Sequence, residues 1–342
     1  MSSGPDVAIN ARAAVRREIG GVERVTRELA ARLPRLRPDR YGVIAPRPAL
    51  AHRRGHAWEQ LALPMLARRH KLLLSPANLA PLAGARNVVM IQDVAPFLGD
   101  WYGSLYSRWH RAVLPRIARH ARLAVAPSDV VRDQLVDMLG AARERTAVVP
   151  LGVDERFSGI HDSERVAARY GLDEPYVLAV GSDVPRKNFA LLDRIAGRLA
   201  GEGLSVVIGG SGRSYMRGGR YAARSLGYVA ENDLPGLYSG AAALAMPSLY
   251  EGFGLPCLEA MACGTPVVAA NRAALPQTCG PAALLVDPGD APAFADALVT
   301  AALDPPTRER LAAAGRERAT RFGWERTARE LDALVTSLLW DA

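Results

Sequence analysis

Two glutamates, Glu251 and Glu259, lie eight residues apart on either side of a glycine-interrupted turn. Gly252 and Gly254 allow the backbone to approach a ligand closely, and the apolar spacing over 255–262 predicts a helix. The amides at the start of a helix attract phosphate. Since eight helical steps span about 12 Å, a diphosphate at these amides would lie between two carboxylates that accept hydrogen bonds from hydroxyls. This layout suits a nucleotide sugar.

Glycines before a helix that carries a glutamate are common in proteins that bind nothing there. The wider segment 248–268 is more specific, because its Ser-Leu-Tyr-Glu-Gly-Phe-Gly-Leu-Pro and Glu-Ala-Met-Ala-Cys-Gly-Thr-Pro-Val-Val stretches resemble the Glu-x7-Glu signature of retaining GT-B glycosyltransferases of family four. The resemblance implies that Glu259 holds the ribose hydroxyls and that Glu251 binds the transferred sugar. The backbone expected to contact the sugar and the phosphates lies at Gly252, Phe253, Gly254 and Leu255.

A basic pair follows a predicted strand at 176–180. At such a strand-to-helix loop, the guanidinium of Arg186 and the ammonium of Lys187 would neutralise a departing diphosphate. Taken alone, this segment favours a solvated basic turn. It resembles, however, the Gly-Ser-x-x-Pro-Arg-Lys-Asn pattern of the family-four transferases, whose basic pair contacts the donor phosphates. Many relatives carry an arginine directly after Gly181, where this chain has Ser182, so Arg186 and Lys187 are expected to stabilise the leaving group.

Paired glycines, Gly20 and Gly21, precede a predicted helix at 22–33. Their amides are able to face a phosphate or an acceptor, although a glycine pair is usually only a turn. The Gly-Gly-Val-Glu-Arg run resembles the start of the same transferases, in which this loop borders the donor diphosphate. The chain contains no Gly-x-Gly-x-x-Gly fingerprint, which argues against a dehydrogenase.

Gln92 and Asp93 end the predicted strand 88–91, a position where parallel sheets place functional residues. Relatives commonly have His-Asp here, and that histidine contacts the donor sugar or assists proton transfer. A glutamine donates and accepts hydrogen bonds but does not titrate near neutral pH. Both residues are catalytic candidates, and Gln92 argues against a mechanism that needs a histidine acid or base at this position.

Other segments extend the resemblance over nearly the whole chain. Tyr228 and Val229 lie at the end of a predicted strand and resemble the Gly-Tyr-Val segment of the family, whose backbone reads a nucleobase edge; without the resemblance, a plain strand end fits equally well. The Trp-Glu-Gln-Leu-Ala-Leu-Pro run at 58–64 and the segment 74–82 resemble a subgroup that assembles polysaccharides and lipid-linked glycans. The match is closest over 176–290.

Short apolar runs alternate with helical patterns, which indicates parallel sheets with crossover helices. The predicted strands are 7–10, 41–45, 72–75, 88–91, 123–126 and 147–149, then 176–180, 204–208, 225–228, 242–246, 265–269 and 283–286. The predicted helices are 22–33, 103–119, 128–139, 189–200, 234–240, 255–262, 291–302, 307–320 and 324–339.

We expect an α/β protein of the GT-B class, with two Rossmann-like doubly wound domains facing each other across a cleft. Proline and glycine interrupt the periodicity near residue 150. The acceptor-side domain is therefore predicted at 1–155 and the nucleotide-sugar-binding domain at 156–323. The last helix, within 324–342, is amphipathic, and the resemblance implies that it crosses back onto the first domain.

A net charge of +8 favours partners that bear phosphate, here a nucleotide sugar or an anionic membrane surface. Nucleic acid is not expected, because no aromatic strand motif and no zinc-finger spacing occurs. The three cysteines fit neither a zinc site nor a redox pair, which favours reduced thiols. No apolar run reaches transmembrane length, and no signal peptide is evident. We expect a cytoplasmic protein, either soluble or attached peripherally to the inner face of the membrane.

The chain contains no Asp-x-Asp pair, with which metal-dependent transferases hold a divalent ion. We therefore expect no metal and no cofactor. The favoured reaction is retaining transfer of a hexose or deoxyhexose from GDP-mannose or a similar donor to a hydroxyl of a glycan, a lipid-linked or a small-molecule acceptor. Two alternatives remain open: a non-catalytic sugar-nucleotide-binding partner subunit, which Gln92 motivates, and a GT-B nucleotide-sugar epimerase.

Overall fold

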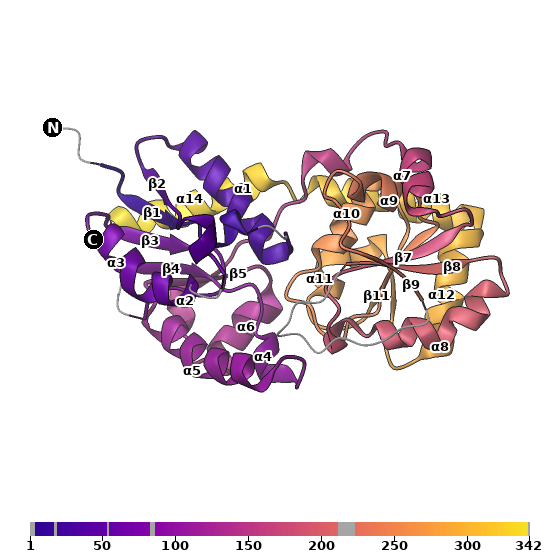
Figure 1. Cartoon of the computed structure of the whole chain (residues 1–342), viewed down its shortest axis with the longest axis horizontal. Helices are drawn as coiled ribbons and strands as arrows, with labels where there is room; N and C mark the ends of the chain where they lie inside the picture. The colour runs from indigo at the N-terminus through magenta and orange to yellow at the C-terminus, as the bar shows by residue number, and fades with distance from the viewer. Residues whose placement is uncertain (1–3, 17–18, 53–54, 83–85, 211–222, 341–342) are drawn as a thin grey trace. The chain divides into compact units, whose positions relative to one another are not determined.

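The computed structural model of the chain describes residues 4–16, 19–52, 55–82, 86–210 and 223–340 (Figure 1). The chain divides into two compact units. The first unit contains Met1–Phe97, Ser107–Gly152 and Trp324–Ala342, and the second contains Leu98–Tyr106 and Val153–Gly323.

The sequence predicts one boundary near residue 155 between the two domains. The structure differs, because the segment Leu98–Tyr106 packs with the second unit. Within that unit, the ring of Trp101 stacks on Tyr250 with centroids 6.3 Å apart. The hydroxyl of Tyr102 accepts a hydrogen bond of 3.2 Å from Nε of Arg186. Aromatic contacts with residues far along the chain therefore determine where this segment belongs.

Each unit contains a six-stranded, fully parallel sheet. In the first unit the strand order is β2-β1-β3-β4-β5-β6, and in the second it is β12-β11-β10-β7-β8-β9. The first sheet is formed by β1 Val7–Asn10, β2 Tyr41–Ile44, β3 Leu72–Ser75, β4 Asn87–Met90, β5 Leu123–Ala126 and β6 Thr146–Val148. The second sheet is formed by β7 Tyr176–Val180, β8 Ser205–Gly209, β9 Arg224–Gly227, β10 Ala243–Met246, β11 Val267–Ala270 and β12 Leu284–Val286.

Helices connect these strands, as expected for parallel pairs that need crossover connections. Those of the first half are α1 Gly21–Leu36, α2 Gly55–Ala57, α3 Leu63–Leu66, α4 Ala95–Leu98, α5 Ser104–His120 and α6 Asp129–Asp137, with a π-helical stretch at Trp58–Ala62. Those of the second half are α7 Ser163–Tyr170, α8 Phe189–Ala200, α9 Leu234–Gly240, α10 Leu255–Cys263, α11 Leu275–Cys279, α12 Ala291–Leu303, α13 Pro305–Thr320 and α14 Trp324–Trp340.

The central strands are apolar throughout because helices cover both faces of each sheet. In the second unit, one face carries α8 and α12, whose Phe189, Leu192, Phe294 and Leu298 join the strand residues of one buried cluster. Helices α9 and α10 pack against each other, and α10 contacts β10 and β11 on the other face. The carboxyl ends of β7 and β10, which pair directly, are thereby held side by side.

The C-terminal helix α14 lies beside α1 in the first unit (Figure 1). Its buried Asp332 accepts hydrogen bonds from the hydroxyl of Tyr41 at 2.8 Å and from Nη1 of Arg40 at 2.9 Å. Burial, followed by the adjacent carboxylate of Asp332, raises the pKa of Tyr41, so its hydroxyl stays a donor. This buried polar contact attaches the end of the chain to the first sheet.

We predict that Asp332→Ala lowers the free energy of unfolding by about 2–3 kcal/mol, since it leaves a buried tyrosine hydroxyl and an arginine without their acceptor. Urea unfolding measures the change. Glu330→Ala is the matched control, because Glu330 pairs on the same helix with Arg326, whose side chain is 61% exposed, and such pairs contribute only about 0–1 kcal/mol. Equal effects of the two variants would contradict this role of Asp332.

Candidate functional site

Glu251 lies in the loop that connects β10 to α10, and its side chain is buried. The loop needs glycine at 254, where φ is +107° and an added Cβ would lie 2.7 Å from Cδ2 of Leu275. The loop backbone is anchored beside it, because the carbonyl of Phe253 accepts a 2.6 Å hydrogen bond from Oγ1 of Thr278. The glycine-rich turn thus places Glu251 at the start of α10 in a fixed conformation.

The basic pair on the neighbouring strand end reaches the same carboxylate. A short 3₁₀ turn, Pro185–Lys187, follows β7. Nζ of Lys187 lies 2.7 Å from Oε1 of Glu251, and Nη1 of Arg186 lies 3.1 Å from the same oxygen. The backbones are also joined, since the amide of Leu249 donates to the carbonyl of Arg186 at 2.7 Å. The structure therefore brings Glu251 together with Lys187 and Arg186, which precede it by 64 and 65 residues in the sequence.

Gly181 makes room for this arrangement. An added Cβ at Gly181 would lie 2.8 Å from Cε and 3.1 Å from Nζ of Lys187. A larger residue would displace the ammonium from Glu251, so glycine is required by the close approach of the lysine stem. Ser182 follows directly and is half-buried.

Charge rather than burial decides the ionisation of Glu251. Burial alone would raise the pKa of its carboxyl, but the charges of Lys187 and Arg186 outweigh burial and hold the pKa at about 2. Burial lowers the pKa of Lys187, while the carboxylate of Glu251 opposes that shift. Ionised Glu251 stabilises the fold above its ordinary pKa of 4.5, and this contribution is lost as the pH falls from about 4.5 toward about 2.

We predict that Glu251→Gln destabilises the protein by about 3–5 kcal/mol, because it leaves the buried ammonium of Lys187 without its carboxylate. The double variant Glu251→Gln/Lys187→Met removes both charges and should recover part of that loss. The midpoint of urea unfolding at pH 7 checks the order of the two variants. If the double variant is the less stable one, the ion pair is not what holds this loop.

Glu259 lies on α10 and is buried. Its Oε2 accepts a hydrogen bond of 2.8 Å from the hydroxyl of Tyr238, which lies on α9. Glu251 and Glu259 thus belong to one loop–helix unit, as the sequence predicts, with different surroundings. The first carboxylate has two cations as partners, whereas the second accepts a hydrogen bond from a tyrosine.

Tyr228 and Val229 follow β9, the edge strand of the second sheet. Tyr228 is exposed and Val229 is buried, near the backbone of Gly209. The amide of Gly210 donates to the carbonyl of Gly227 at 2.7 Å, which fixes this strand end against β8. Both residues therefore lie at the carboxyl edge of the sheet that carries Glu251.

Four predicted site residues belong to the first unit, where each has a local partner or a local role. The side chain of Gln92 donates to the carbonyl of Pro76 at 2.8 Å, and Oδ1 of Asp93 accepts from the amide of Ala95 at 3.0 Å, at the start of α4. The amide of Gly20 donates to Oε2 of Glu23 at 3.1 Å, and Gly21 begins α1. A binding role for these groups stays a prediction.

The Trp-Glu-Gln run forms part of a buried polar cluster in the same unit. Oε1 of Glu59 accepts a hydrogen bond of 2.9 Å from Asn10 and lies 2.9 Å from Nε of Arg12. Burial would raise the pKa of Glu59, but His56 and Arg12 together hold it below its ordinary value. The cluster ties the loop after β1 to the π-helical stretch.

Sequence reasoning missed Tyr102, Trp101 and Tyr238 as neighbours of the site. Tyr102 and Trp101 reach Arg186 and Tyr250 through contacts distant in sequence, and Tyr238 occupies an apolar helical spacing that resembles ordinary core. The described part of the chain contains no group of three or more histidine, cysteine, aspartate or glutamate side chains placed to hold a metal. None of its helices is long and apolar enough to cross a membrane.

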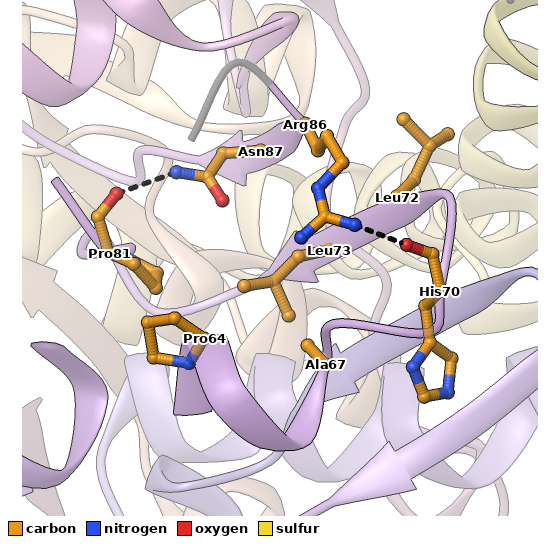
Figure 2. Close-up of a pocket in the computed structure, with 8 residues that line it drawn as sticks. All are labelled: Pro64, Ala67, His70, Leu72, Leu73, Pro81, Arg86 and Asn87. Atoms are coloured by element: carbon orange, nitrogen blue, oxygen red, sulfur yellow. Dashed lines mark hydrogen bonds between the residues drawn. The ribbon is translucent and has the colours of Figure 1, made fainter. Parts of the chain in front are cut away.

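A cavity of about 20 Å³ lies at the amino ends of β3 and β4 in the first unit (Figure 2). The side chain of Asn87 closes one side of it by donating to the carbonyl of Pro81 at 2.7 Å, and Nη1 of Arg86 donates to the carbonyl of His70 at 2.8 Å. Such a volume admits about one water molecule. It lies at the edge of the sheet opposite to that where parallel sheets bind ligands, so it is no sugar site.

Two family models match the chain. Residues 162–318 match the model described as glycosyl transferases group 1, and residues 84–157 match the model described as glycosyltransferase family 4. The first match contains Arg186, Lys187, Glu251 and Glu259. The second contains Gln92 and Asp93.

Named relatives are similar over part of the chain. The chain is 34% identical over 220 residues to O-antigen chain mannosyltransferase B of Escherichia coli, covering 60% of this chain and 58% of the relative. It is 36% identical over 236 residues to D-inositol 3-phosphate glycosyltransferase of Kribbella flavida, covering 62% and 56%. The chain thus spans less than three fifths of the length of these relatives.

The crystal structure of Anabaena HepE in complex with UDP-glucose is similar over 97% of this chain and 99% of that one, with a TM-score of 0.73 and 18% identity. Together with the two parallel six-stranded sheets, this likeness identifies a two-domain Rossmann-like GT-B fold. The fold expected from the sequence is therefore confirmed.

Proposed function

This chain belongs to the group 1, family 4 glycosyltransferases, and from that premise we propose that it transfers a sugar from a nucleotide-diphosphate sugar to a hydroxyl acceptor. The observation that carries the proposal is the cluster of Arg186, Lys187 and Glu251 beyond the carboxyl ends of β7 and β10. Ligands of open parallel sheets bind at this edge.

The cluster supplies the charge that such a transfer requires. Breaking the bond between the sugar and its diphosphate leaves negative charge on the leaving oxygen, and preorganised cations lower the barrier for this step. Lys187 and Arg186 are held near Glu251 before any donor binds, which means that their positive charge is already oriented. A carboxylate beside them is then placed to accept hydrogen bonds from sugar hydroxyls.

We assign the remaining roles by the same reasoning. Glu259 accepts hydrogen bonds from the ribose, and the amides of Phe253, Gly254 and Leu255 face the phosphates at the start of α10. Tyr228 and Val229 lie where a base edge is read. The acceptor attacks from the face that the diphosphate leaves, with a phosphate oxygen as base, so the sugar keeps its anomeric configuration. The two cations perform the neutralisation that a divalent metal performs in other transferases, and no metal is needed.

A hexose donor of the GDP-mannose type fits the names of the relatives. One is a mannosyltransferase of O-antigen synthesis, and the other is named for transfer to inositol 3-phosphate. The HepE structure contains UDP-glucose, which is a donor of the same chemical class. We therefore propose a glycan, a lipid-linked or a small polar acceptor for this chain.

We predict that Lys187→Met lowers the rate of sugar transfer by about 10²–10³-fold, the cost of removing one preorganised stabilising group. Transfer from GDP-mannose and UDP-glucose is followed by release of the nucleoside diphosphate, and EDTA should leave the wild-type rate unchanged. Lys71→Met is the matched control, because Lys71 is the only other lysine of the chain and its side chain is 61% exposed.

Three results would contradict this assignment. Near-normal transfer by folded Lys187→Met would show that the cluster does not take part in the reaction. Loss of activity with EDTA would contradict the metal-free mechanism. A sugar epimer as the product, in the presence or absence of acceptor, would identify an epimerase instead.

The exposed face of α5 supports a contact with an anionic membrane. The helix carries four arginines and no acidic residue. Leu105 and Trp109 on this helix are 74% and 38% exposed, and Arg108 and Arg116 are exposed beside them. Apolar and aromatic side chains interleaved with arginines are typical of helices that lie in the headgroup region of a bilayer. We propose this face as the membrane contact of the protein.

We predict that Arg108→Glu/Arg116→Glu weakens binding to vesicles containing phosphatidylglycerol by at least roughly tenfold, since each cation near an anionic surface contributes about 1 kcal/mol. Co-sedimentation with vesicles of phosphatidylcholine, alone or mixed with phosphatidylglycerol, measures the change. Arg308→Glu/Arg310→Glu on α13 is the control with the same change in charge. Equal losses in both double variants would show that only the net charge matters.

A further inference from the structure

A tyrosine contacts the carboxylate that the proposed function assigns to the ribose. Tyr238 and Glu259 come from α9 and α10, and both side chains are buried. The hydroxyl of Tyr238 donates to Oε2 of Glu259 at 2.8 Å. A buried hydrogen bond is costly to break, so this contact fixes the orientation of the carboxyl group.

The tyrosine itself is held from two further sides. Its ring packs edge to face against Phe157, with centroids 5.9 Å apart and planes at 70°. Its carbonyl accepts a hydrogen bond of 2.7 Å from Oγ1 of Thr265, whose own amide donates to the carbonyl of Ala260 in α10 at 2.9 Å. Thr265 thus ties the backbone of Tyr238 to the helix that carries Glu259. Neither partner is free to turn away from the other.

A carboxylate has two oxygens with about four lone-pair directions. Once Tyr238 occupies one direction on Oε2, rotation of the carboxylate plane would break a buried hydrogen bond. The other directions are therefore fixed as well. A site whose acceptors are fixed rejects a ligand that lacks the matching hydroxyl, because a buried acceptor then stays unpaired.

We propose that Tyr238 is a positioning residue, whose hydroxyl orients Glu259 so that the site selects ribonucleotide donors over 2′-deoxyribonucleotide donors. The inference rests on the proposed function, in which Glu259 accepts hydrogen bonds from the ribose. It adds the group that makes this carboxylate selective. UDP and GDP donors are then preferred over dTDP donors.

The test is the ratio of dissociation constants for a ribonucleotide and its 2′-deoxy analogue. Calorimetry on the full chain compares UDP with 2′-deoxy-UDP, and GDP with 2′-deoxy-GDP. We expect Tyr238→Phe to lower the preference for the ribonucleotide by roughly tenfold, the effect of one hydrogen bond. Glu259→Gln should lower it at least as much.

Tyr176→Phe is the matched control. The hydroxyl of Tyr176 is also buried in the second unit, and it donates to the carbonyl of Leu237 at 2.7 Å, one residue before Tyr238. Its loss should lower stability without changing the ribose preference. If Tyr238→Phe does not fold, Thr265→Val removes the backbone anchor of Tyr238 and should lower the preference in the same direction.

The outcomes separate this inference from the function on which it rests. If the ribonucleotide preference is unchanged in Tyr238→Phe but is lost in Glu259→Gln, the role of Tyr238 is overturned and the proposed donor site stands. Equal falls in Tyr238→Phe and Tyr176→Phe also overturn it, since any lost tyrosine hydroxyl would then suffice. If the wild-type protein binds none of the four diphosphates, the proposed function fails, and the inference fails with it.

Discussion

The buried ion pair between Lys187 and Glu251 is the interaction on which the site depends. Two charges removed from water are stable only when each satisfies the other, so the turn after β7 and the loop after β10 must stay together. Gly181 supports this pair, because an added Cβ there would clash with the lysine stem. Gly254 has a different role, since it leaves room for Leu275 beside the loop.

That pair also explains how a basic site persists without a ligand. Two adjacent cations repel each other in a buried environment, and Glu251 relieves this repulsion. In the function proposed above, sugar hydroxyls become a second partner of this carboxylate. Glu259 accepts a hydrogen bond from the hydroxyl of Tyr238. The contacts described for the two glutamates therefore differ in kind.

The sequence predicts the fold well because parallel strands that are buried on both faces are continuous apolar runs. All twelve predicted strands are present, with shifts of one or two residues at their ends. The sequence does not predict short helices such as α4, α7 and α11, since four to eight residues show too little periodicity. Arg186 lies close to Glu251 because they follow β7 and β10, which are neighbours in the sheet. Nothing in the sequence around Tyr102 or Tyr238 indicates that these residues lie near the site. Whether Gln92, Asp93, Gly20 and Gly21 act in the reaction stays a prediction.

The chain passes between its two units four times, at residues 97, 106, 152 and 323. The short excursion Leu98–Tyr106 has a consequence for recombination among relatives. A chimaera joined only at residue 152 would combine the Trp101 and Tyr102 of one parent with the Tyr250 and Arg186 of the other. Exchange of the second unit between homologues should therefore carry residues 98–106 along with it, as a separate insertion into the sequence of the first unit.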